Sequence, residues 1–273
     1  MLSFVLENSA NANARILFGN DSRTLHTNQS ARRSIRSQDW QCDIDTGPNP
    51  TNSASHLLTC SRHYDTTMTN KDFFTIGSRI LASLPGHTAQ KNLAFAQPIG
   101  HTLKGVCFDR SAFDARSFYV QVFILPLFVP AKHLGFNLGW RVGGGSHRWN
   151  ADDPNMISDL NDALQREAVP FLSRVRSPRE VAAAAVSLNK TKDPYVQEAI
   201  AYALALAGES EQAVAAFKQL AALLDTQIPW QLEMEQRAQK FKADFLCNPT
   251  VAQKQLESWR VETAKNLGLE RFL

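Results

Sequence analysis

The sequence predicts an α+β protein, in which a small, mostly antiparallel sheet flanked by helices precedes an all-α C-terminal region of about five helices. Two observations carry this prediction. The segment 118–142 holds two apolar stretches around Pro130–His133, a pattern typical of adjacent strands. From Pro154 onward, apolar residues recur instead at the three- and four-residue spacing of helices. A chain of 273 residues is long enough for one large or two modest domains.

Composition divides the chain into three parts. Residues 1–67 are rich in Ser, Thr and Asn, contain no Lys and show no sustained apolar period. Such a stretch buries too little apolar surface to offset the entropy of ordering it. We interpret it as a disordered leader or as a misassigned translation start with Met68 as the initiator, and both interpretations stay open. Residues 68–176 then form the predicted α+β domain, and residues 177–273 form the helical C-terminal region.

The α+β domain is predicted to begin with a helix over residues 73–84, which Pro85–Gly86 ends. A second helix over residues 156–164 is predicted to close the domain before Pro170 interrupts it. Between these helices lie short runs of apolar residues bounded by turn-forming residues, which we interpret as strands. The predicted strands are residues 93–95, 101–108, 117–127 and 134–142.

The first central strand is apolar on both of its faces. Tyr119, Gln121 and Phe123 point to one side, because side chains alternate along a strand, and the even-numbered residues from Phe118 to Ile124 point to the other. A strand with this pattern lies inside a sheet that is covered on each side, and we expect helices to provide the cover. The second central strand alternates apolar with polar or small residues, as expected of a half-exposed strand.

Five helices are predicted in the C-terminal region, and two of them carry clear start signals. Ser177–Glu180 is a capping box with proline at the first helical position. Asp193–Pro194 opens the next helix, and Gly208 closes it. The predicted helices are residues 179–188, 194–207, 211–224, 230–245 and 249–266.

The pair of helices over residues 194–224 resembles a single tetratricopeptide-type helical hairpin. Ala201, Gly208, Ala213 and Phe217 stand where that repeat has small residues, a turn and an aromatic residue. One repeat cannot form a solenoid, because stacked neighbours are what bury the faces of each repeat. The resemblance therefore implies packing of two helices and a surface for another protein, without a peptide-binding array.

A second resemblance rests on the two central strands. Residues 118–130, FYVQVFILPLFVP, and residues 136–142, FNLGWRV, resemble uncharacterised bacterial cytosolic proteins that join a small α+β domain of unknown function to a helical tail. The resemblance covers about half of the chain. It implies a fold and a cytoplasmic location, and it implies no activity, ligand or site residue.

Composition and charge narrow the classes of function. The chain is 44% hydrophobic and 20% charged, which is typical of globular proteins. Its net charge is only +3, and its basic residues are dispersed, so we expect no nucleic-acid partner. The longest apolar run, residues 118–130, is shorter than a membrane span and contains Gln121 and Pro126. We therefore expect a cytoplasmic protein without a membrane partner, whose oligomeric state stays open.

No residue pattern predicts a metal site or a cofactor. The four cysteines are widely scattered and form no Cys-x-x-Cys pair, which favours reduced thiols. His87, His101, His133 and His147 form none of the paired spacings of metal ligands. Cys107 and His101 would suit a nucleophile and its base, but six residues along a strand separate them by roughly 20 Å. Cys107 is therefore predicted to be a small core residue.

The one candidate binding site in the sequence follows the second central strand. Three consecutive glycines between a strand and a helix can form a backbone nest for an anion, and neighbouring basic side chains supply positive charge. The segment lacks the Gly-Lys-Ser/Thr of a phosphate loop, and a flexible surface turn is the alternative interpretation. Trp149 is expected to be the least buried tryptophan, because it stands beside Arg148. The candidate ligand-binding residues are Arg141, Gly143, Gly144, Gly145, His147, Arg148 and Trp149.

We expect a non-enzymatic binding or adaptor protein that contacts another protein through its helical C-terminal region. The expectation follows from the absence of any motif that specifies a reaction, together with the predicted helix–helix packing. The alternative is an enzyme acting on a small molecule or a phosphoester, which would use the glycine-rich loop 143–145 with the neighbouring Arg and His side chains. No residue is predicted to be catalytic.

Overall fold

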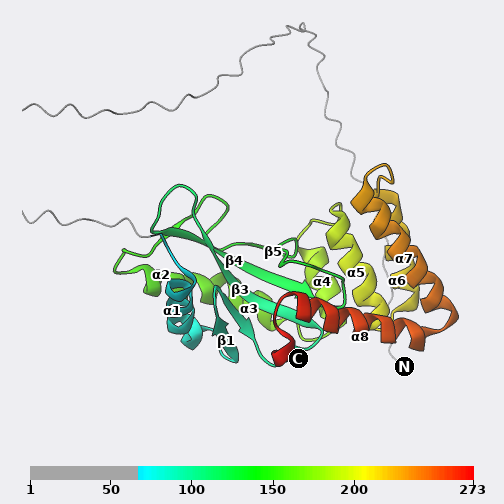
Figure 1. The fold of residues 1–273 in the computed structure, drawn as a ribbon, viewed down its shortest axis with the longest axis horizontal. Helices are drawn as coiled ribbons and strands as arrows, with labels where there is room; N and C mark the ends of the chain where they lie inside the picture. Colours follow the sequence, from blue (N-terminus) through cyan, green and yellow to red (C-terminus); the bar gives the residue numbers. More distant parts are fainter. Residues whose placement is uncertain (1–66) are drawn as a thin grey trace, which may run out of the picture. The chain divides into compact units, whose positions relative to one another are not determined.

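A computed structural model describes residues 67–273 as an antiparallel sheet followed by helices, five of which form the C-terminal region, and this confirms the predicted α+β class (Figure 1). The segment 1–67, predicted to be a leader or a misassigned start, lies outside the described residues except for Thr67. The helices are α1 (Asn70–Ile80), α2 (Met156–Ala163), α3 (Val169–Ser173), α4 (Pro178–Ser187), α5 (Pro194–Leu206), α6 (Ser210–Leu223), α7 (Pro229–Cys247) and α8 (Pro249–Asn266).

The sheet has six strands in the order β1-β2-β3-β4-β5, and β6 also pairs with β4. Every pairing is antiparallel, as expected. Two strands were not predicted, because the sequence of β1 is polar and β6 has only two residues. The strands are β1 (His87–Gln90), β2 (Leu93–Ala96), β3 (Thr102–Arg110), β4 (Ser117–Pro126), β5 (Gly139–Arg141) and β6 (Trp149–Asn150).

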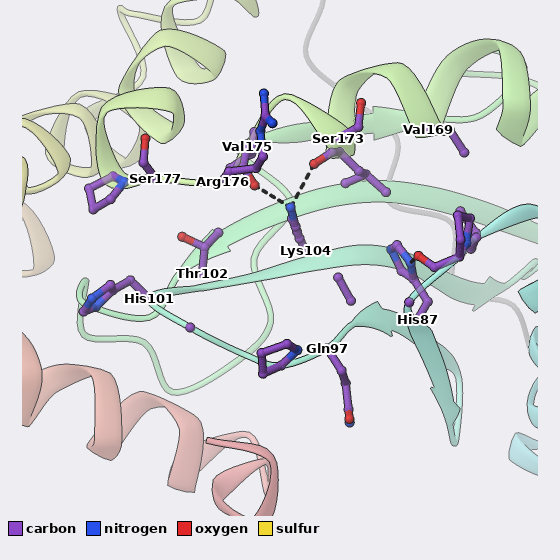
Figure 2. A pocket seen from close by; sticks show the side chains of 18 residues that line it. His87, Gln97, His101, Thr102, Lys104, Val169, Ser173, Val175, Arg176 and Ser177 are labelled. Atoms are coloured by element: carbon purple, nitrogen blue, oxygen red, sulfur yellow. Dashed lines mark hydrogen bonds between the residues drawn. The ribbon is translucent and has the colours of Figure 1, made fainter.

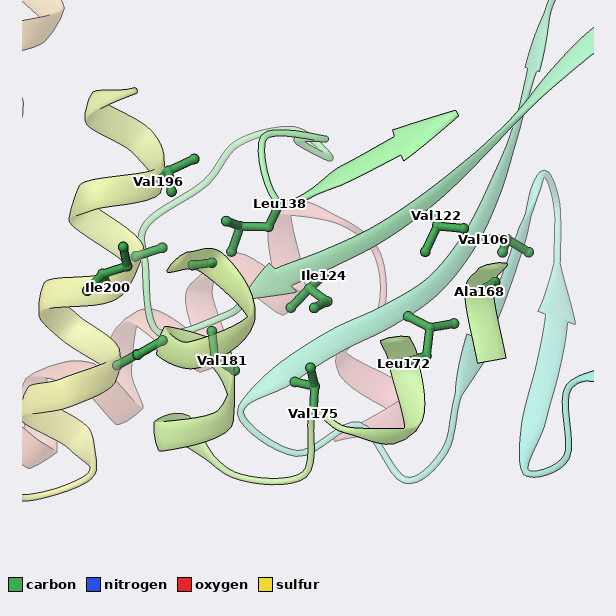
Figure 3. Packing of buried hydrophobic residues seen from close by; sticks show 14 of the residues in the cluster. Val106, Val122, Ile124, Leu138, Ala168, Leu172, Val175, Val181, Val196 and Ile200 are labelled. Carbon is green, nitrogen blue, oxygen red and sulfur yellow. The ribbon is translucent and has the colours of Figure 1, made fainter. Parts of the chain in front are cut away.

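One face of strand β4 is fully buried, and the other face is covered only in part, because Phe123 is buried there whereas Tyr119, Gln121 and Leu125 are half-buried. Phe118, Val120, Val122 and Ile124 belong to a large cluster that continues into the helices from α2 to α5 (Figure 3). Phe123 points to the other face and belongs to a second cluster, which residues at the C-terminal end of the chain help to cover. The buried members of this second cluster are Phe95, Ile99, Leu103, Cys107, Phe123, Leu127, Ala264 and Leu269.

The second central strand is shorter than predicted. Of the segment 134–142, only Gly139–Arg141 pairs with β4, opposite Gln121–Phe123. Phe136 leaves the strand path and packs edge-to-face on Phe123, with ring centroids 5.8 Å apart. Leu134 and Phe136 therefore pack on the second cluster and do not pair with β4, whereas the Leu138 carbonyl still accepts a hydrogen bond from the Ile124 N–H at 2.9 Å.

The helix after β6 is not interrupted at Pro170, contrary to the prediction. Helix α2 leads into a π-helical turn, Leu164–Ala168, which continues directly into α3. Proline has no N–H to donate to a carbonyl one turn earlier, and the wider turn before it accommodates the missing bond. Ala168 and Leu172 of this element belong to the same buried cluster as Val122 of the sheet (Figure 3).

The C-terminal helices begin where their caps predict. Ser177 Oγ accepts a hydrogen bond from the Glu180 N–H at 3.3 Å, and Asp193 Oδ1 accepts one from the Tyr195 N–H at 2.9 Å. Gly208, with φ of +77°, follows α5 and allows the tight turn into α6. Among the helices of residues 67–273, none is both long and apolar enough to cross a membrane.

The large apolar cluster runs without a break from the sheet into the C-terminal helices. Val175 precedes the predicted domain boundary at residues 176/177, Val181 and Ile200 follow it, and all three are buried in the same cluster (Figure 3). The division into two domains at this position stays a prediction. The helix–helix packing expected of α5 and α6 is present, since Ala201, Ala213 and Phe217 are buried.

Candidate functional site

The glycine-rich segment after β5 lies on the surface, and its polar groups contact one another. Arg141 Nη1 donates to the Gly145 carbonyl at 3.0 Å, and the guanidinium lies 3.9 Å from the centroid of the Tyr119 ring. The Gly143 N–H donates to Glu167 Oε2 at 3.1 Å. A carboxylate of the protein therefore already occupies one of the N–H groups that were predicted to bind an anion.

The other residues of this segment face different neighbours. Arg148 lies over the ring of Phe113, and His147 packs edge-to-face on Trp149 with centroids 4.5 Å apart. Trp149 is only 7% exposed, so the expectation that it is the least buried tryptophan was wrong, because β6 pairs with β4 and places the indole in the core. Two cavities of about 470 and 480 Å³ in residues 67–273 are lined by other residues. Anion binding by this segment stays a prediction.

The described residues include two free cysteines, of which Cys247 is exposed and Cys107 is buried. Cys107 is a buried core residue, as predicted, and burial raises the pKa of its thiol to about 12. The thiol is therefore protonated at neutral pH and is a poor nucleophile. Within residues 67–273, no three His, Cys, Asp or Glu side chains gather in a way that would hold a metal ion.

A cavity of about 470 Å³ lies between the chain that follows β4 and the helices α5 and α7. We call it the α5–α7 cavity. Most of its wall is apolar. Tyr195, Glu198 and Arg237 contribute polar groups from the two helices, and Lys132, His133 and Asn137 contribute polar groups from the chain after β4. The apolar lining residues are Ile124, Leu125, Pro126, Val129, Pro130, Ala131, Leu134, Leu138 and Ala199.

A buried ion pair lines the α5–α7 cavity. The Glu198 side chain is 1% exposed, and its Oε1 accepts hydrogen bonds from Arg237 Nε at 3.0 Å and from Nη2 at 2.7 Å. Burial raises the pKa of Glu198, and the Arg237 guanidinium opposes this change. Within residues 67–273, both hydrogen bonds end on one carboxylate oxygen. Glu198 Oε2 and the Nη1 group of Arg237 take no part in these two bonds, and the buried Tyr202 hydroxyl also lies beside the guanidinium.

The sequence contains a signal for this ion pair that our prediction missed. Glu198 stands in a helix whose residues are buried almost all round, and a carboxylate is found in such a place only when it is paired. Arg237 lies 39 residues further along the chain, on α7. The glutamate was therefore recognisable as unusual, but its partner becomes apparent only when the two helices pack.

Two exposed aromatic side chains stack beside the cavity. Tyr195 lines the cavity and is 48% exposed, and Trp230 is 40% exposed. Their rings are parallel within 5°, with centroids 5.0 Å apart. Each residue directly follows the proline that starts its helix, Pro194 or Pro229, so the first turns of α5 and α7 position the pair. Exposed tyrosine and tryptophan are enriched where proteins bind one another.

Helix α8 holds one wall of the α5–α7 cavity in place. The buried Thr263 hydroxyl donates to the Val129 carbonyl at 3.2 Å and accepts a hydrogen bond from the Ala131 N–H at 3.2 Å. Asn266 Nδ2 donates to the Ala131 carbonyl at 3.1 Å. Because these bonds tie the chain after β4 to α8, the wall is formed before any ligand arrives.

Replacing Thr263 by valine should therefore destabilise the protein. Valine has a similar shape, but it leaves the Val129 carbonyl and the Ala131 N–H without partners, at an expected cost of about 1–3 kcal/mol in the free energy of unfolding. Thr250→Val is the matched control, because Thr250 is exposed on the same helix. Urea denaturation measures both variants. Equal stabilities of Thr263→Val and Thr250→Val would contradict the role of the hydroxyl.

The fold and the site together define an α+β protein whose helical region presents a preformed, mostly apolar cavity with an aromatic pair beside it. Comparison of the chain with protein-family models, with curated protein sequences and with solved structures finds no match. The resemblance to uncharacterised bacterial proteins thus stays a prediction. A functional conclusion depends on the geometry of the site.

Proposed function

We propose that this protein is a non-enzymatic binding protein that holds a peptide segment of a partner protein in the α5–α7 cavity. The observation that carries the proposal is the exposed, parallel pair of Tyr195 and Trp230 beside an apolar cavity. Rigid aromatic side chains supply a large contact area at a low cost in conformational entropy. The expected surface for a partner protein then lies at the starts of α5 and α7, where Tyr195 and Trp230 stack.

The chemistry of the cavity matches a peptide. Its apolar wall can receive an apolar side chain, and its volume of about 470 Å³ is ample for one. The ion pair of Glu198 and Arg237 is neutral as a whole, yet it offers an acceptor and a donor side by side. A main-chain amide presents the complementary donor and acceptor. The wall held by Thr263 reduces the ordering cost of binding, because it is already in place.

Peptides selected from a random display library against the full chain should bind at this site. We expect them to share an apolar or aromatic residue, and we expect Trp230→Ala to weaken their affinity by about tenfold or more, because truncation of a central aromatic contact typically has this effect. Fluorescence anisotropy with labelled peptides measures the dissociation constants. Tyr195→Ala should have an effect of similar size.

Phe74→Ala provides the matched control for these variants. Phe74 is also an exposed aromatic residue, but it lies on α1, in the N-terminal part of the described chain. Its replacement should leave the affinity for the selected peptides unchanged. The proposal would be wrong if the library yielded no binding peptide, or if Phe74→Ala and Trp230→Ala weakened binding equally.

A further inference from the structure

A second cavity, of about 480 Å³, opens between the first three strands of the sheet and the chain that joins α3 to α4 (Figure 2). We call it the basic cavity, because four of its lining residues have basic side chains and none is Asp or Glu. It shares no lining residue with the α5–α7 cavity. The basic residues are His87, His101, Lys104 and Arg176, and the apolar ones include Leu84, Ala96, Pro98, Val169, Leu172 and Val175.

Lys104 brings a positive charge into this cavity from β3. Its ammonium group donates to the main-chain carbonyls of Leu172 and Val175, at the end of α3 (Figure 2). An ammonium has three N–H donors, and the third has no hydrogen-bond partner within residues 67–273. No carboxylate of the described residues lies within 4.0 Å of it. A half-buried charge without a counter-ion is unfavourable, and an anion would relieve it.

Arg176 adds a second positive charge. Burial lowers the pKa of Lys104, and the charge of Arg176 acts in the same direction, whereas Glu180 opposes both. Arg176 Nε lies 3.9 Å from Glu180 Oε1, which is longer than a hydrogen bond. The guanidinium N–H groups of Arg176 therefore remain available among the described residues, although a carboxylate is close by.

His87 contributes a neutral edge to the cavity. Burial lowers the pKa of its imidazole, so the ring is uncharged at neutral pH. Nδ1 lies 3.1 Å from the Pro85 carbonyl, and a neutral ring that donates there carries its proton on Nδ1. Nε2 is then a buried acceptor without a partner within residues 67–273. Lys104 therefore carries the positive charge inside the cavity, and Arg176, whose side chain is 77% exposed, adds a second charge at the mouth of the cavity.

We propose that the basic cavity binds a small organic anion, whose carboxylate or phosphate group pairs with Lys104 and Arg176 and whose apolar body lies against Leu172 and its apolar neighbours. This site is independent of the peptide site proposed above. The chemistry shared by the two anions is a compact negative charge with several acceptor oxygens, which suits an ammonium beside a guanidinium. The volume of the cavity exceeds that of an inorganic anion, so an organic body is part of the ligand.

Three probes of the same size separate the contributions of charge and apolar contact. We would titrate the full chain with 2-naphthoate, 2-naphthyl phosphate and the neutral 2-naphthamide by isothermal titration calorimetry, at about 50 mM salt to limit screening. At least one acid should bind about tenfold more tightly than the amide. The acid that binds with the higher affinity shows whether the preferred anionic group is a carboxylate or a phosphate.

Two arginines provide a matched pair of variants for this test. Arg176 lines the cavity, whereas Arg174 is exposed two residues earlier and does not line it. Arg176→Gln should weaken binding of the preferred acid by about tenfold, and Arg174→Gln by less than about twofold. Lys104→Met should have an effect at least as large as Arg176→Gln. If loss of the two carbonyl contacts unfolds Lys104→Met, the comparison of Arg176→Gln with Arg174→Gln tests the proposal by itself.

Three results would overturn the proposal. Equal affinities of the amide and the acids would show that the cavity recognises only apolar surface. Equal losses of affinity in Arg174→Gln and Arg176→Gln would show a general effect of net charge. The third such result is the absence of binding by both acids. Each result is distinguishable from failure of the peptide site, because the two cavities share no residue.

Discussion

Replacement of Arg237 by methionine is expected to lower the free energy of unfolding by about 3–5 kcal/mol near neutral pH, because it leaves the carboxylate of Glu198 buried without its counter-charge. Glu198 is 1% exposed and receives both of its described hydrogen bonds from this guanidinium. Methionine retains most of the apolar stem of arginine, so the loss reflects the charge and its hydrogen bonds. Urea denaturation at several pH values measures the effect.

The cost of Arg237→Met should depend on pH. Burial raises the folded-state pKa of Glu198 above its ordinary value of 4.5, and removal of the guanidinium that opposes burial raises it further. A carboxyl group with a raised folded-state pKa stabilises the fold below its unfolded pKa, and this contribution is lost as the pH rises through the folded-state pKa. The variant should therefore be closest to the wild type near pH 4.5, and the difference should grow toward neutral pH.

The double variant Glu198→Met with Arg237→Met is the control for this prediction. It removes both charges together, and replacement of a buried ion pair by apolar residues of similar volume is often neutral or stabilising. We expect its stability to exceed that of Arg237→Met and to lack the added pH dependence. A pH-independent loss in Arg237→Met would contradict the assignment of Glu198 as a buried, ionised partner.

Phe123→Ala is expected to cost about 3–5 kcal/mol, the range typical of removing a fully buried aromatic side chain. Phe123 lies on the face of β4 that the second apolar cluster covers, and its ring meets Phe136 edge-to-face. Phe113→Ala is the matched control, because Phe113 is exposed, and it should change the stability by less than about 0.5 kcal/mol. Chemical denaturation of both variants gives the comparison.

The same pair of rings tests how the chain after β4 covers the sheet. A double-mutant cycle of Phe123→Ala and Phe136→Ala should give a coupling energy of about 0.5–1.5 kcal/mol, as edge-to-face aromatic pairs do. Additive effects would show that Phe136 does not pack on the sheet. The shortened β5 would then lack its physical explanation.

The parts of the fold that the sequence predicted are those that local patterns encode. The alternation along β4 predicted that both faces are covered, and the caps at Ser177 and Asp193 marked the starts of α4 and α5. The predicted length of β5 was wrong, because the strand-like residue Phe136 packs on the ring of Phe123 and does not pair with β4. That contact is between residues far apart in the sequence. A local pattern does not distinguish these two uses of an apolar residue.

The candidate site was harder to predict, because its parts come from separate helices. Tyr195 and Trp230 each appear unremarkable at the start of a helix, and only packing of α5 beside α7 stacks them. Glu198 carried a signal, since a carboxylate in a buried helix needs a partner, but the sequence did not name Arg237. The glycine-rich loop was the more visible motif, yet Glu167 and Gly145 already contact its polar groups.

Occupation of the α5–α7 cavity by a partner's side chain is tested most directly by the peptide affinity of Ala199→Phe. Ala199 is buried on α5 and lines the cavity, so a larger side chain there takes up the space that the peptide needs. Ala222→Phe, at an exposed position on α6, is the matched control. We predict that Ala199→Phe weakens the selected peptides by about tenfold or more and that Ala222→Phe changes their affinity by less than about twofold. Wild-type affinity in a folded Ala199→Phe variant would contradict binding in this cavity.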